Sequence, residues 1–156
     1  MLFRSRVPPC DAVIAIGEVV TYILPGQTAR EHEAGVFGFF QRAFEALRPG
    51  GLLIFDFMES ARRRTFKGRI RAGEDWTITS YAVVSRAGRV LTRRMTTVRR
   101  IGQRLRRSME THRVRVFGRT EISNALKRAG FRVVMRRSIG RVRLIHGDLL
   151  LIARKP

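Results

Sequence analysis

Two short apolar runs near the start of the chain constrain its fold more than any other feature. Residues 11–16 read Asp-Ala-Val-Ile-Ala-Ile, and residues 52–57 read Leu-Leu-Ile-Phe-Asp-Phe. Short runs without polar alternation predict strands buried on both faces, as in a parallel sheet. Between them, Thr28 and Glu31 form a capping-box pattern, and apolar residues then recur at helical spacing up to Leu47. This segment therefore predicts a strand–helix–strand unit with parallel strands.

The middle of the chain predicts an antiparallel insertion. Residues 60–75 are polar and rich in Arg and Gly, and we expect them to form a mobile connection. Three strand-like segments follow, joined by short glycine-containing links as in a three-strand meander: residues 76–85, 90–100 and 104–117.

A last helix and two strands are expected to complete the fold. Thr120 is expected to cap a helix that closes at Gly130, since glycine tolerates the left-handed conformation found at helix ends. Residues 131–135 and 148–153 predict two further strands, with a connection at 138–147 between them.

The charge of the chain is unevenly distributed. The 156 residues include 32 Lys and Arg against 12 Asp and Glu, a net charge of +20. Residues 1–60 hold five Arg and seven acids, whereas residues 61–156 hold 27 basic residues and five acids. The second part is either a polyanion-binding region or the product of an arginine-rich composition, because 29 of the 32 basic residues are Arg. We favour the compositional explanation.

Several other classes of protein are not supported. The apolar stretches are too short for a membrane span and are interrupted by Glu18 and Asp56, so we expect no membrane partner. The single cysteine, Cys10, permits no internal disulfide and suits a reducing compartment, which predicts a cytoplasmic protein. The three histidines have no metal-ligand spacing, so no metal site is expected. Neither a Gly-x-Ser-x-Gly elbow nor a phosphate-binding P-loop is present.

Four sequence motifs, in the order in which they occur along the chain, resemble those of class I S-adenosylmethionine-dependent methyltransferases. Cys-Asp-Ala-Val-Ile-Ala-Ile-Gly-Glu-Val-Val-Thr-Tyr, at 10–22, is similar to the fourth strand of that family and the loop after it. Leu-Arg-Pro-Gly-Gly, within 40–56, is typical of the turn into the fifth strand. Residues 121–131, ending Ala-Gly-Phe, resemble the late helix, and residues 149–155 resemble the last strand. The resemblance covers essentially the whole chain.

The resemblance extends only to the rear part of the family's domain. The family's first strand ends in a glycine-rich loop that holds the cofactor, but these 14 glycines include no Gly-x-Gly. Only ten residues precede Asp11, where the predicted strand within that segment begins. We therefore expect the N-terminal cofactor-loop half to be missing, either because the chain is a natural fragment or because its start is set too late. We expect S-adenosylmethionine, the cofactor that the resemblance implies, to bind this chain weakly or not at all.

These expectations define a fold class and a division of the chain. The class is α/β: a partial Rossmann-like methyltransferase sheet, with helices on its faces and an inserted antiparallel three-strand meander. Residues 1–156 are expected to form a single incomplete domain, made of a strand–helix–strand core (1–59), an inserted meander that roofs the substrate (60–117), and the late helix with the last two strands (118–156).

The resemblance implies where the cofactor and the reaction centre lie. In the family, the loop after the fourth strand is next to the methyl group, which makes Ile16, Gly17 and Glu18 the candidate cofactor-binding residues. Glu18 and His112 are the candidate catalytic residues, because either side chain can orient an acceptor or take its proton. The alternatives are that Glu18 caps the next helix or pairs with an arginine, and that His112 is structural.

Four further residues are candidates for the substrate pocket. Tyr22 follows the cofactor loop, and Asp56 ends the second strand, at the edge of the sheet where open α/β sheets bind ligands. Trp76 and Tyr81 lie in the meander. The alternatives are that Tyr22 belongs to the core and that Asp56 only satisfies loop amides.

The sequence thus predicts methyl transfer to a small-molecule acceptor, impaired in this chain. One alternative is a nucleic-acid-binding, RNA methyltransferase-like protein that uses a set of arginines: Arg93, Arg94, Arg99, Arg100, Arg104, Arg106 and Arg107. It is not favoured, because consecutive strand residues point to opposite faces. The other alternative is a non-catalytic interaction protein. Residues 11–16 would then self-associate or pair with a partner through their open apolar edge.

Overall fold

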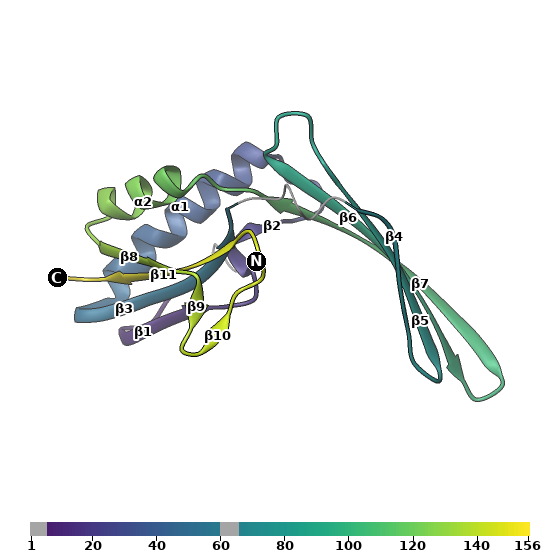
Figure 1. The fold of residues 1–156 in the computed structure, drawn as a ribbon. Helices are drawn as coiled ribbons and strands as arrows, with labels where there is room; N and C mark the ends of the chain where they lie inside the picture. Colours follow the sequence, from purple (N-terminus) through teal and green to yellow (C-terminus); the bar gives the residue numbers. More distant parts are fainter. Residues whose placement is uncertain (1–5, 60–65) are drawn as a thin grey trace.

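The computed structural model of this chain describes residues 6–59 and 66–156, which form two large β-sheets, a short hairpin and two helices (Figure 1). The four-stranded core sheet has the order β1–β3–β11–β8, with the bounds β1 (Cys10–Ala15), β3 (Leu47–Met58), β11 (Asp148–Arg154) and β8 (Arg132–Arg136). β1 and β3 are parallel and are connected through helix α1 (Ala29–Ala46), which confirms the predicted strand–helix–strand unit. The predicted α/β class is also confirmed.

Strand β1 differs from the prediction that it is buried on both faces. Among the described strands it pairs only with β3 and therefore lies at the edge of the core sheet. Ala15 is buried, whereas Ile14 is 67% exposed. The prediction is wrong because an apolar run indicates which residues prefer burial, but it does not say whether both faces of the sheet are covered.

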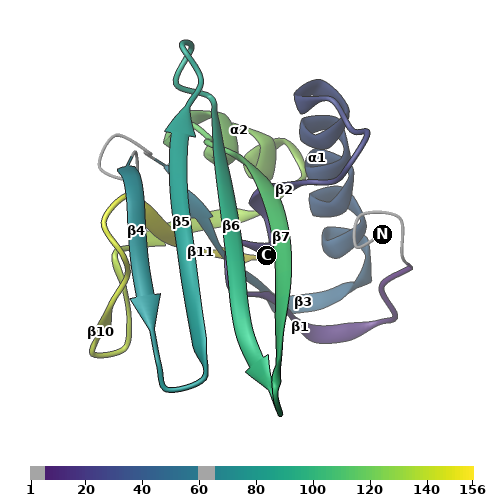
Figure 2. The same cartoon turned by 90° about the vertical axis from the view of Figure 1, so that its right-hand side faces the viewer.

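The inserted sheet is larger than the predicted three-strand meander. Its order is β2–β7–β6–β5–β4, all antiparallel, with the bounds β2 (Tyr22–Ile23), β7 (Arg104–Arg115), β6 (Val90–Ile101), β5 (Trp76–Val84) and β4 (Phe66–Ala72) (Figure 2). The three predicted strands correspond to β5, β6 and β7. The two strands that the sequence missed, β2 and β4, lie at the edges of this sheet.

Part of the connection predicted at residues 60–75 forms a strand. Residues 60–65 lie outside the described residues, and residues 66–72 form β4. The sequence of β4, Phe-Lys-Gly-Arg-Ile-Arg-Ala, lacks the apolar alternation of a half-buried strand, so backbone pairing with β5 determines its conformation. The connection predicted at 138–147 contains a small hairpin formed by β9 (Ser138–Ile139) and β10 (Val142–Arg143).

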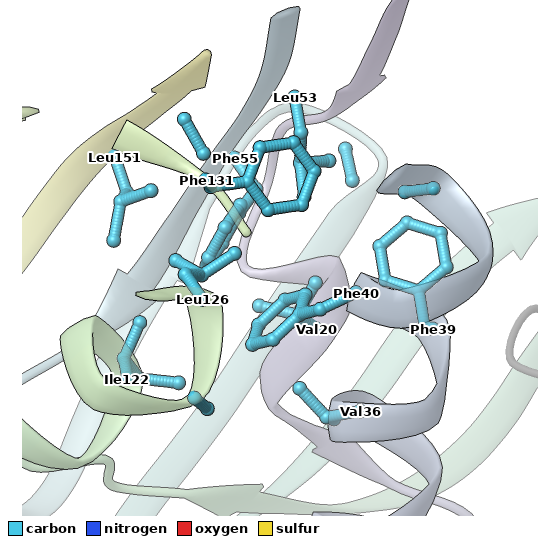
Figure 3. Packing of buried hydrophobic residues seen from close by; sticks show 14 of the residues in the cluster. Val20, Val36, Phe39, Phe40, Leu53, Phe55, Ile122, Leu126, Phe131 and Leu151 are labelled. Carbon is cyan, nitrogen blue, oxygen red and sulfur yellow. The ribbon is translucent and has the colours of Figure 1, made fainter. Parts of the chain in front are cut away.

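Both helices pack on the same face of the core sheet. Helix α2 (Arg119–Arg128) lies beside α1, and their apolar residues meet Leu53, Phe55 and Leu151 of the sheet in one buried cluster (Figure 3). Within it, the rings of Phe40 and Phe55 are stacked with centroids 5.1 Å apart. Burial of these side chains contributes roughly 1.5–3 kcal/mol each, which makes this cluster the main source of stability.

A second, smaller cluster joins the two sheets. Met58, at the end of β3, packs with Ala82, Leu91 and Val114 of the inserted sheet. The face of the inserted sheet that carries these three residues is called the core-facing side below. Because of this contact, the side chains on the core-facing side point towards the carboxyl end of β3.

The predicted helix ends are confirmed in part. The Thr28 hydroxyl accepts the Glu31 N–H at 3.2 Å, and the Glu31 carboxylate accepts the Thr28 N–H at 2.7 Å, which completes the capping box of α1. Gly130 has the expected positive φ, at 102°. The prediction for Thr120 is wrong, because α2 begins at Arg119 after the cap residue Gly118.

Candidate functional site

The loop after β1 contains the three residues predicted to lie beside the cofactor. Ile16 is 41% exposed, and Gly17 and Glu18 have positive φ angles of 96° and 59°. A side chain at Gly17 would meet no atom within 4 Å, so there is open space beside the loop. Glu18 is buried and precedes a short 3-10 turn, Val19–Thr21. The three residues therefore form one sharp turn at the carboxyl end of β1.

Asp56, predicted in the substrate pocket, is engaged in holding this loop. It is buried, and its Oδ1 accepts the N–H groups of Gly17 at 2.8 Å and Glu18 at 2.9 Å. Such charge-assisted hydrogen bonds are about twice as strong as neutral ones. These hydrogen bonds are the ones expected in the alternative role, in which Asp56 satisfies loop amides.

Tyr22 and His112 come together on the core-facing side of the inserted sheet. Because Tyr22 pairs with Val114, His112 is its diagonal neighbour on the same face. Their rings meet edge to face, with centroids 5.6 Å apart. Arg93 donates to the Tyr22 hydroxyl at 3.3 Å, and His112 Nε2 lies 3.2 Å from Glu110 Oε2. We call Tyr22, Arg93, Glu110 and His112 the Tyr22 cluster.

Two members of the Tyr22 cluster were not among the residues predicted for the site. Arg93 pairs directly with His112 across β6 and β7, and Glu110 is two residues from His112 on the same strand. Alternation along each strand was the signal that could have placed them on this face. The pairing register between the strands was also needed, and the sequence alone does not provide it.

Trp76 is distant from the Tyr22 cluster. It pairs with Arg99, six residues along β6 from Arg93, which corresponds to roughly 20 Å of strand. At that end of the sheet it lines a separate pocket with Gly73, Glu74 and Leu105. The structure therefore does not bring Trp76 together with Tyr22.

Tyr81 lies on the opposite face of the inserted sheet. It pairs with Arg94, whereas its neighbour Ala82 pairs with Arg93 of the Tyr22 cluster. Arg94 donates to the Tyr81 hydroxyl at 2.9 Å, and the two side chains line a pocket of about 250 Å³ with Val83 and Thr92. Because successive strand residues alternate between faces, Tyr81 cannot share a pocket with His112.

The arginines of the nucleic-acid alternative are divided between the two faces. By the pairing register, Arg93, Arg99, Arg104 and Arg106 lie on one side and Arg94, Arg100 and Arg107 on the other. They therefore do not form the single basic stripe that tracks a phosphate backbone.

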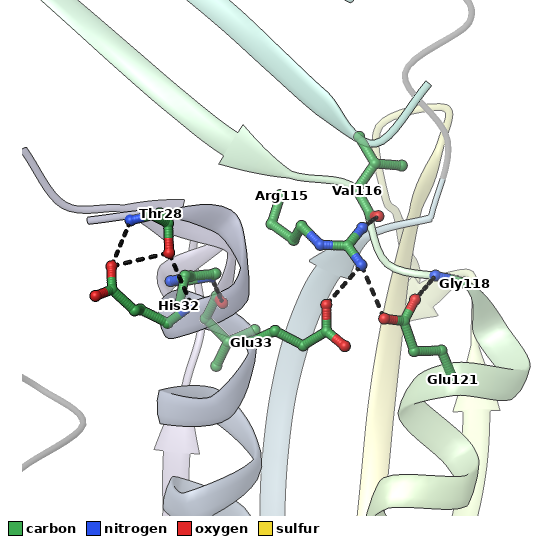
Figure 4. Close-up of polar contacts among 9 residues, drawn as sticks. Thr28, His32, Glu33, Arg115, Val116, Gly118 and Glu121 are labelled. Atoms are coloured by element: carbon green, nitrogen blue, oxygen red, sulfur yellow. Dashed lines mark hydrogen bonds and ion pairs between the residues drawn. The ribbon is translucent and has the colours of Figure 1, made fainter. Parts of the chain in front are cut away.

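Arg115 attaches the inserted sheet to both helices. It is buried at the end of β7, and its Nη2 donates to Glu33 of α1 at 2.9 Å and to Glu121 of α2 at 2.8 Å (Figure 4). Its Nη1 donates to the Val116 carbonyl, and its guanidinium lies 4.9 Å from the centre of the Phe117 ring. Because His112 is on the same strand, this contact also holds the strand that carries the Tyr22 cluster.

His32 is a buried histidine of α1 that belongs to the packing between helix and loop. Its Nε2 lies 3.0 Å from the Val20 carbonyl, and its ring packs near Phe117. Burial lowers the pKa of His32, and this effect outweighs the opposing hydrogen bond to Val20. The histidine is therefore held in its neutral form.

Two other properties concern the described part of the chain. Within residues 6–59 and 66–156, no three His, Cys, Asp or Glu side chains gather in a group able to hold a metal ion. Neither α1 nor α2 is long and apolar enough to span a membrane.

Comparison with solved structures identifies the fold. An S-adenosylmethionine-dependent methyltransferase from Clostridium acetobutylicum ATCC 824 matches 99% of this chain with a TM-score of 0.82 and 12% identity. CalS10, an amino pentose methyltransferase from Micromonospora echinaspora involved in calicheamicin biosynthesis, matches all of it with a TM-score of 0.71 and 17% identity. KedS8, a sugar N-methyltransferase from Streptoalloteichus sp ATCC 53650, also matches all of it, with a TM-score of 0.70 and 18% identity. The chain thus has the fold of S-adenosylmethionine-dependent methyltransferases.

The match covers all of this chain but only part of those proteins. The chain spans 62%, 63% and 61% of the lengths of these three structures. No protein-family model and no curated protein matches the sequence.

Proposed function

We propose that this chain forms the acceptor side of an S-adenosylmethionine-dependent methyltransferase that modifies a small-molecule amine or hydroxyl. The main support is that the match to the Clostridium acetobutylicum enzyme includes 99% of the chain, and so extends over the inserted sheet as well as the core sheet. Two further neighbours are described as methyltransferases of an amino pentose and of a sugar nitrogen. Fold alone does not establish function, so the proposal also depends on the chemistry of the loop and the Tyr22 cluster.

The loop after β1 fits one side of the cofactor. Ile16 presents an apolar side chain to solvent, and Gly17 leaves the adjacent space open. The buried Glu18 follows, on backbone held by Asp56. When bound, S-adenosylmethionine supplies the methyl group as an electrophile. These residues hold and align its methyl end, whereas the chain contains no Gly-x-Gly to hold the rest.

In this proposal His112 acts as the general base. Its Nε2 lies 3.2 Å from the Glu110 carboxylate. With the ring proton on Nε2 donated to Glu110, Nδ1 has the lone pair that accepts a proton. A neutral amine or hydroxyl that gains a methyl group must lose one proton, and Nδ1 takes it. Glu110 holds the ring in the required tautomer and stabilises the charged form.

Arg93 and Tyr22 position the acceptor. The Arg93 guanidinium donates to the Tyr22 hydroxyl, and its Nε is buried without a hydrogen-bond partner. A substrate oxygen that reaches this nitrogen would satisfy it. We therefore expect an acceptor that carries a hydroxyl or an anionic oxygen near the methylated atom.

The test is methyl transfer from radiolabelled S-adenosylmethionine to a panel of amino sugars and small hydroxylated amines. We expect transfer only at millimolar cofactor, because this sequence has no Gly-x-Gly and spans 62% of the length of the matched Clostridium acetobutylicum enzyme. His112→Gln should lower the rate by about 100-fold or more, the usual contribution of a general base, whereas His146→Gln, at an exposed position, should not. Absence of transfer at every cofactor concentration contradicts the catalytic role. Micromolar cofactor affinity in calorimetry contradicts the expected impairment.

A further inference from the structure

The inserted sheet ends in two turns on the side away from the core sheet (Figure 1 and Figure 2). One turn joins β4 to β5 at residues 73–75, and the other joins β6 to β7 at residues 102–103. The two turns lie together, because the Arg100 N–H donates to the Asp75 carbonyl at 2.7 Å. Both hairpins lie within the described residues 66–156. This end of the sheet is therefore a projection of the molecule.

Arginine dominates the β6–β7 hairpin at this end. Residues 99–107 contain five arginines and no acidic residue. All five are exposed: Arg99, Arg100, Arg104, Arg106 and Arg107. The neighbouring turn contributes the two acids Glu74 and Asp75, so this end of the sheet has a net charge of +3. It is an exposed basic projection that suits an anionic partner.

Apolar side chains are exposed among these arginines. Leu105 is 69% exposed, Ile101 is 46% exposed and Trp76 is 41% exposed. Trp76 pairs with Arg99 of β6, which in turn pairs with Arg106 of β7. We call Trp76 together with residues 99–107 the distal tip. Tryptophan and aliphatic side chains interleaved with basic ones are typical of segments that lie in the interface of an anionic membrane.

The arginines of the distal tip lie on both faces of the sheet. By the pairing register, Arg99, Arg104 and Arg106 are on the core-facing side, and Arg100 and Arg107 are on the opposite side. A nucleic-acid backbone that follows one face meets only part of this charge. A layer of anionic headgroups that the tip enters end-on meets all of it, because long arginine side chains reach outward from both faces while the apolar ones enter more deeply. The geometry therefore favours a lipid surface over a nucleic acid.

We propose that the distal tip docks on the surface of a membrane that contains anionic phospholipids. Trp76, Ile101 and Leu105 enter the interface, and the arginines bind the phosphate groups around them. Contact with a surface needs no spanning segment, so the proposal revises the expectation of no membrane partner, which rested on the shortness of the apolar runs. The inference does not depend on the proposed methyl transfer, because no member of the Tyr22 cluster belongs to the distal tip.

Trp76 provides the first test, because it is the single tryptophan of the chain and lies in the distal tip. Vesicles made of equal amounts of phosphatidylglycerol and phosphatidylcholine are titrated into the chain at about 0.1 M salt. The emission of Trp76 should shift to shorter wavelength, and lipids brominated on their acyl chains should quench it. Vesicles of phosphatidylcholine alone should cause neither change. Failure to bind the anionic vesicles, or binding without quenching of Trp76, would overturn the proposal.

The apolar part of the contact is tested with matched double variants. Ile101→Ser combined with Leu105→Ser should weaken binding to the anionic vesicles about tenfold or more. Val142→Ser combined with Ile145→Ser is the control, since each of these residues is 70% exposed and neither belongs to the distal tip. This control should bind like the unmodified chain, and circular dichroism confirms that each variant is folded. Equal weakening in the two double variants would contradict a contact at the distal tip.

The basic part is tested at an equal change of net charge. Arg106→Gln combined with Arg107→Gln should weaken binding about tenfold or more. Arg132→Gln combined with Arg136→Gln removes the same charge from exposed positions of β8, and it should weaken binding less than about threefold because distant charges are screened. Equal losses would show attraction to net charge alone and would contradict the proposal. Should a short single-stranded RNA displace the chain from the vesicles, the distal tip is a nucleic-acid contact and the proposal is wrong.

Discussion

The carboxylate of Asp56 accepts the backbone N–H of Glu18 at 2.9 Å and thereby holds a non-glycine residue at a φ of 59°. A left-handed conformation costs such a residue about 1–2 kcal/mol, so the loop needs this support. The same oxygen also accepts the Gly17 N–H. The turn that presents the candidate cofactor-binding residues is thus maintained by a residue of the neighbouring strand.

Replacement of Asp56 by Ala should destabilise the protein by about 2–4 kcal/mol, because two loop amides lose a buried charged acceptor. Urea unfolding followed by circular dichroism measures this change. Asp11→Ala is the matched control, since Asp11 forms an exposed ion pair with Arg48 at 2.7 Å. It should cost less than about 1 kcal/mol. Similar losses in the two variants would contradict the role assigned to Asp56.

The same substitution at two glycines should have opposite effects. Gly17→Ala should lower stability by about 1–2 kcal/mol, because φ is 96° although there is room for the added carbon. Gly38 lies within helix α1, where Ala is the better helix former, and the added Cβ would meet only the flexible end of Arg42. Gly38→Ala should therefore raise stability by about 0.5–1 kcal/mol. Thermal unfolding distinguishes the two signs, and a stabilising Gly17→Ala would exclude the described loop conformation.

The two predicted helix caps give a further test. Thr28→Ala removes the hydroxyl that accepts the Glu31 N–H and should cost about 1 kcal/mol in the free energy of unfolding. Thr120→Ala should cost less than about 0.5 kcal/mol, since α2 is capped at Gly118 and Thr120 already lies within the helix. A larger loss of stability for Thr120→Ala than for Thr28→Ala would indicate that Thr120 caps α2, as the sequence predicted.

The elements that the sequence predicted well are those with a local signal. The strand–helix–strand unit has apolar runs of the right lengths and a capping box formed by Thr28 and Glu31, which are three residues apart. β4 has no such signal, because its conformation comes from pairing with β5 and only its position in the sheet makes it a strand. A local apolar pattern also cannot show whether both faces of a sheet are covered, which is why β1 was expected to be buried on both faces although Ile14 is exposed.

The candidate site shows the same limit. Tyr22 and His112 are 90 positions apart, and they meet because β2 pairs with β7 at Val114. Both residues were candidates from the sequence, whereas the places of Arg93 and Glu110 depend on the register between strands. Trp76 and Tyr81 were selected as aromatic residues of the insertion. Trp76 lies far along the sheet from the Tyr22 cluster, and Tyr81 lies on the opposite face.

Stability should fall as the pH is lowered below neutral because of His32. Burial lowers the pKa of this side chain from its ordinary 6.5, so the unfolded chain binds a proton more readily than the folded one. Well above pH 6.5, His32 is neutral in both states and does not contribute to the pH dependence. As the pH falls through 6.5, protonation of the unfolded chain favours unfolding until the lower pKa of the folded state is reached. Urea midpoints measured from pH 7.5 to 5.5 should therefore decrease, and His32→Gln should flatten this decrease while keeping a donor for the Val20 carbonyl. His146→Gln, at an exposed position, should retain the dependence of the unmodified protein. A His32→Gln profile as steep as that of the unmodified protein would assign the pH dependence to other groups.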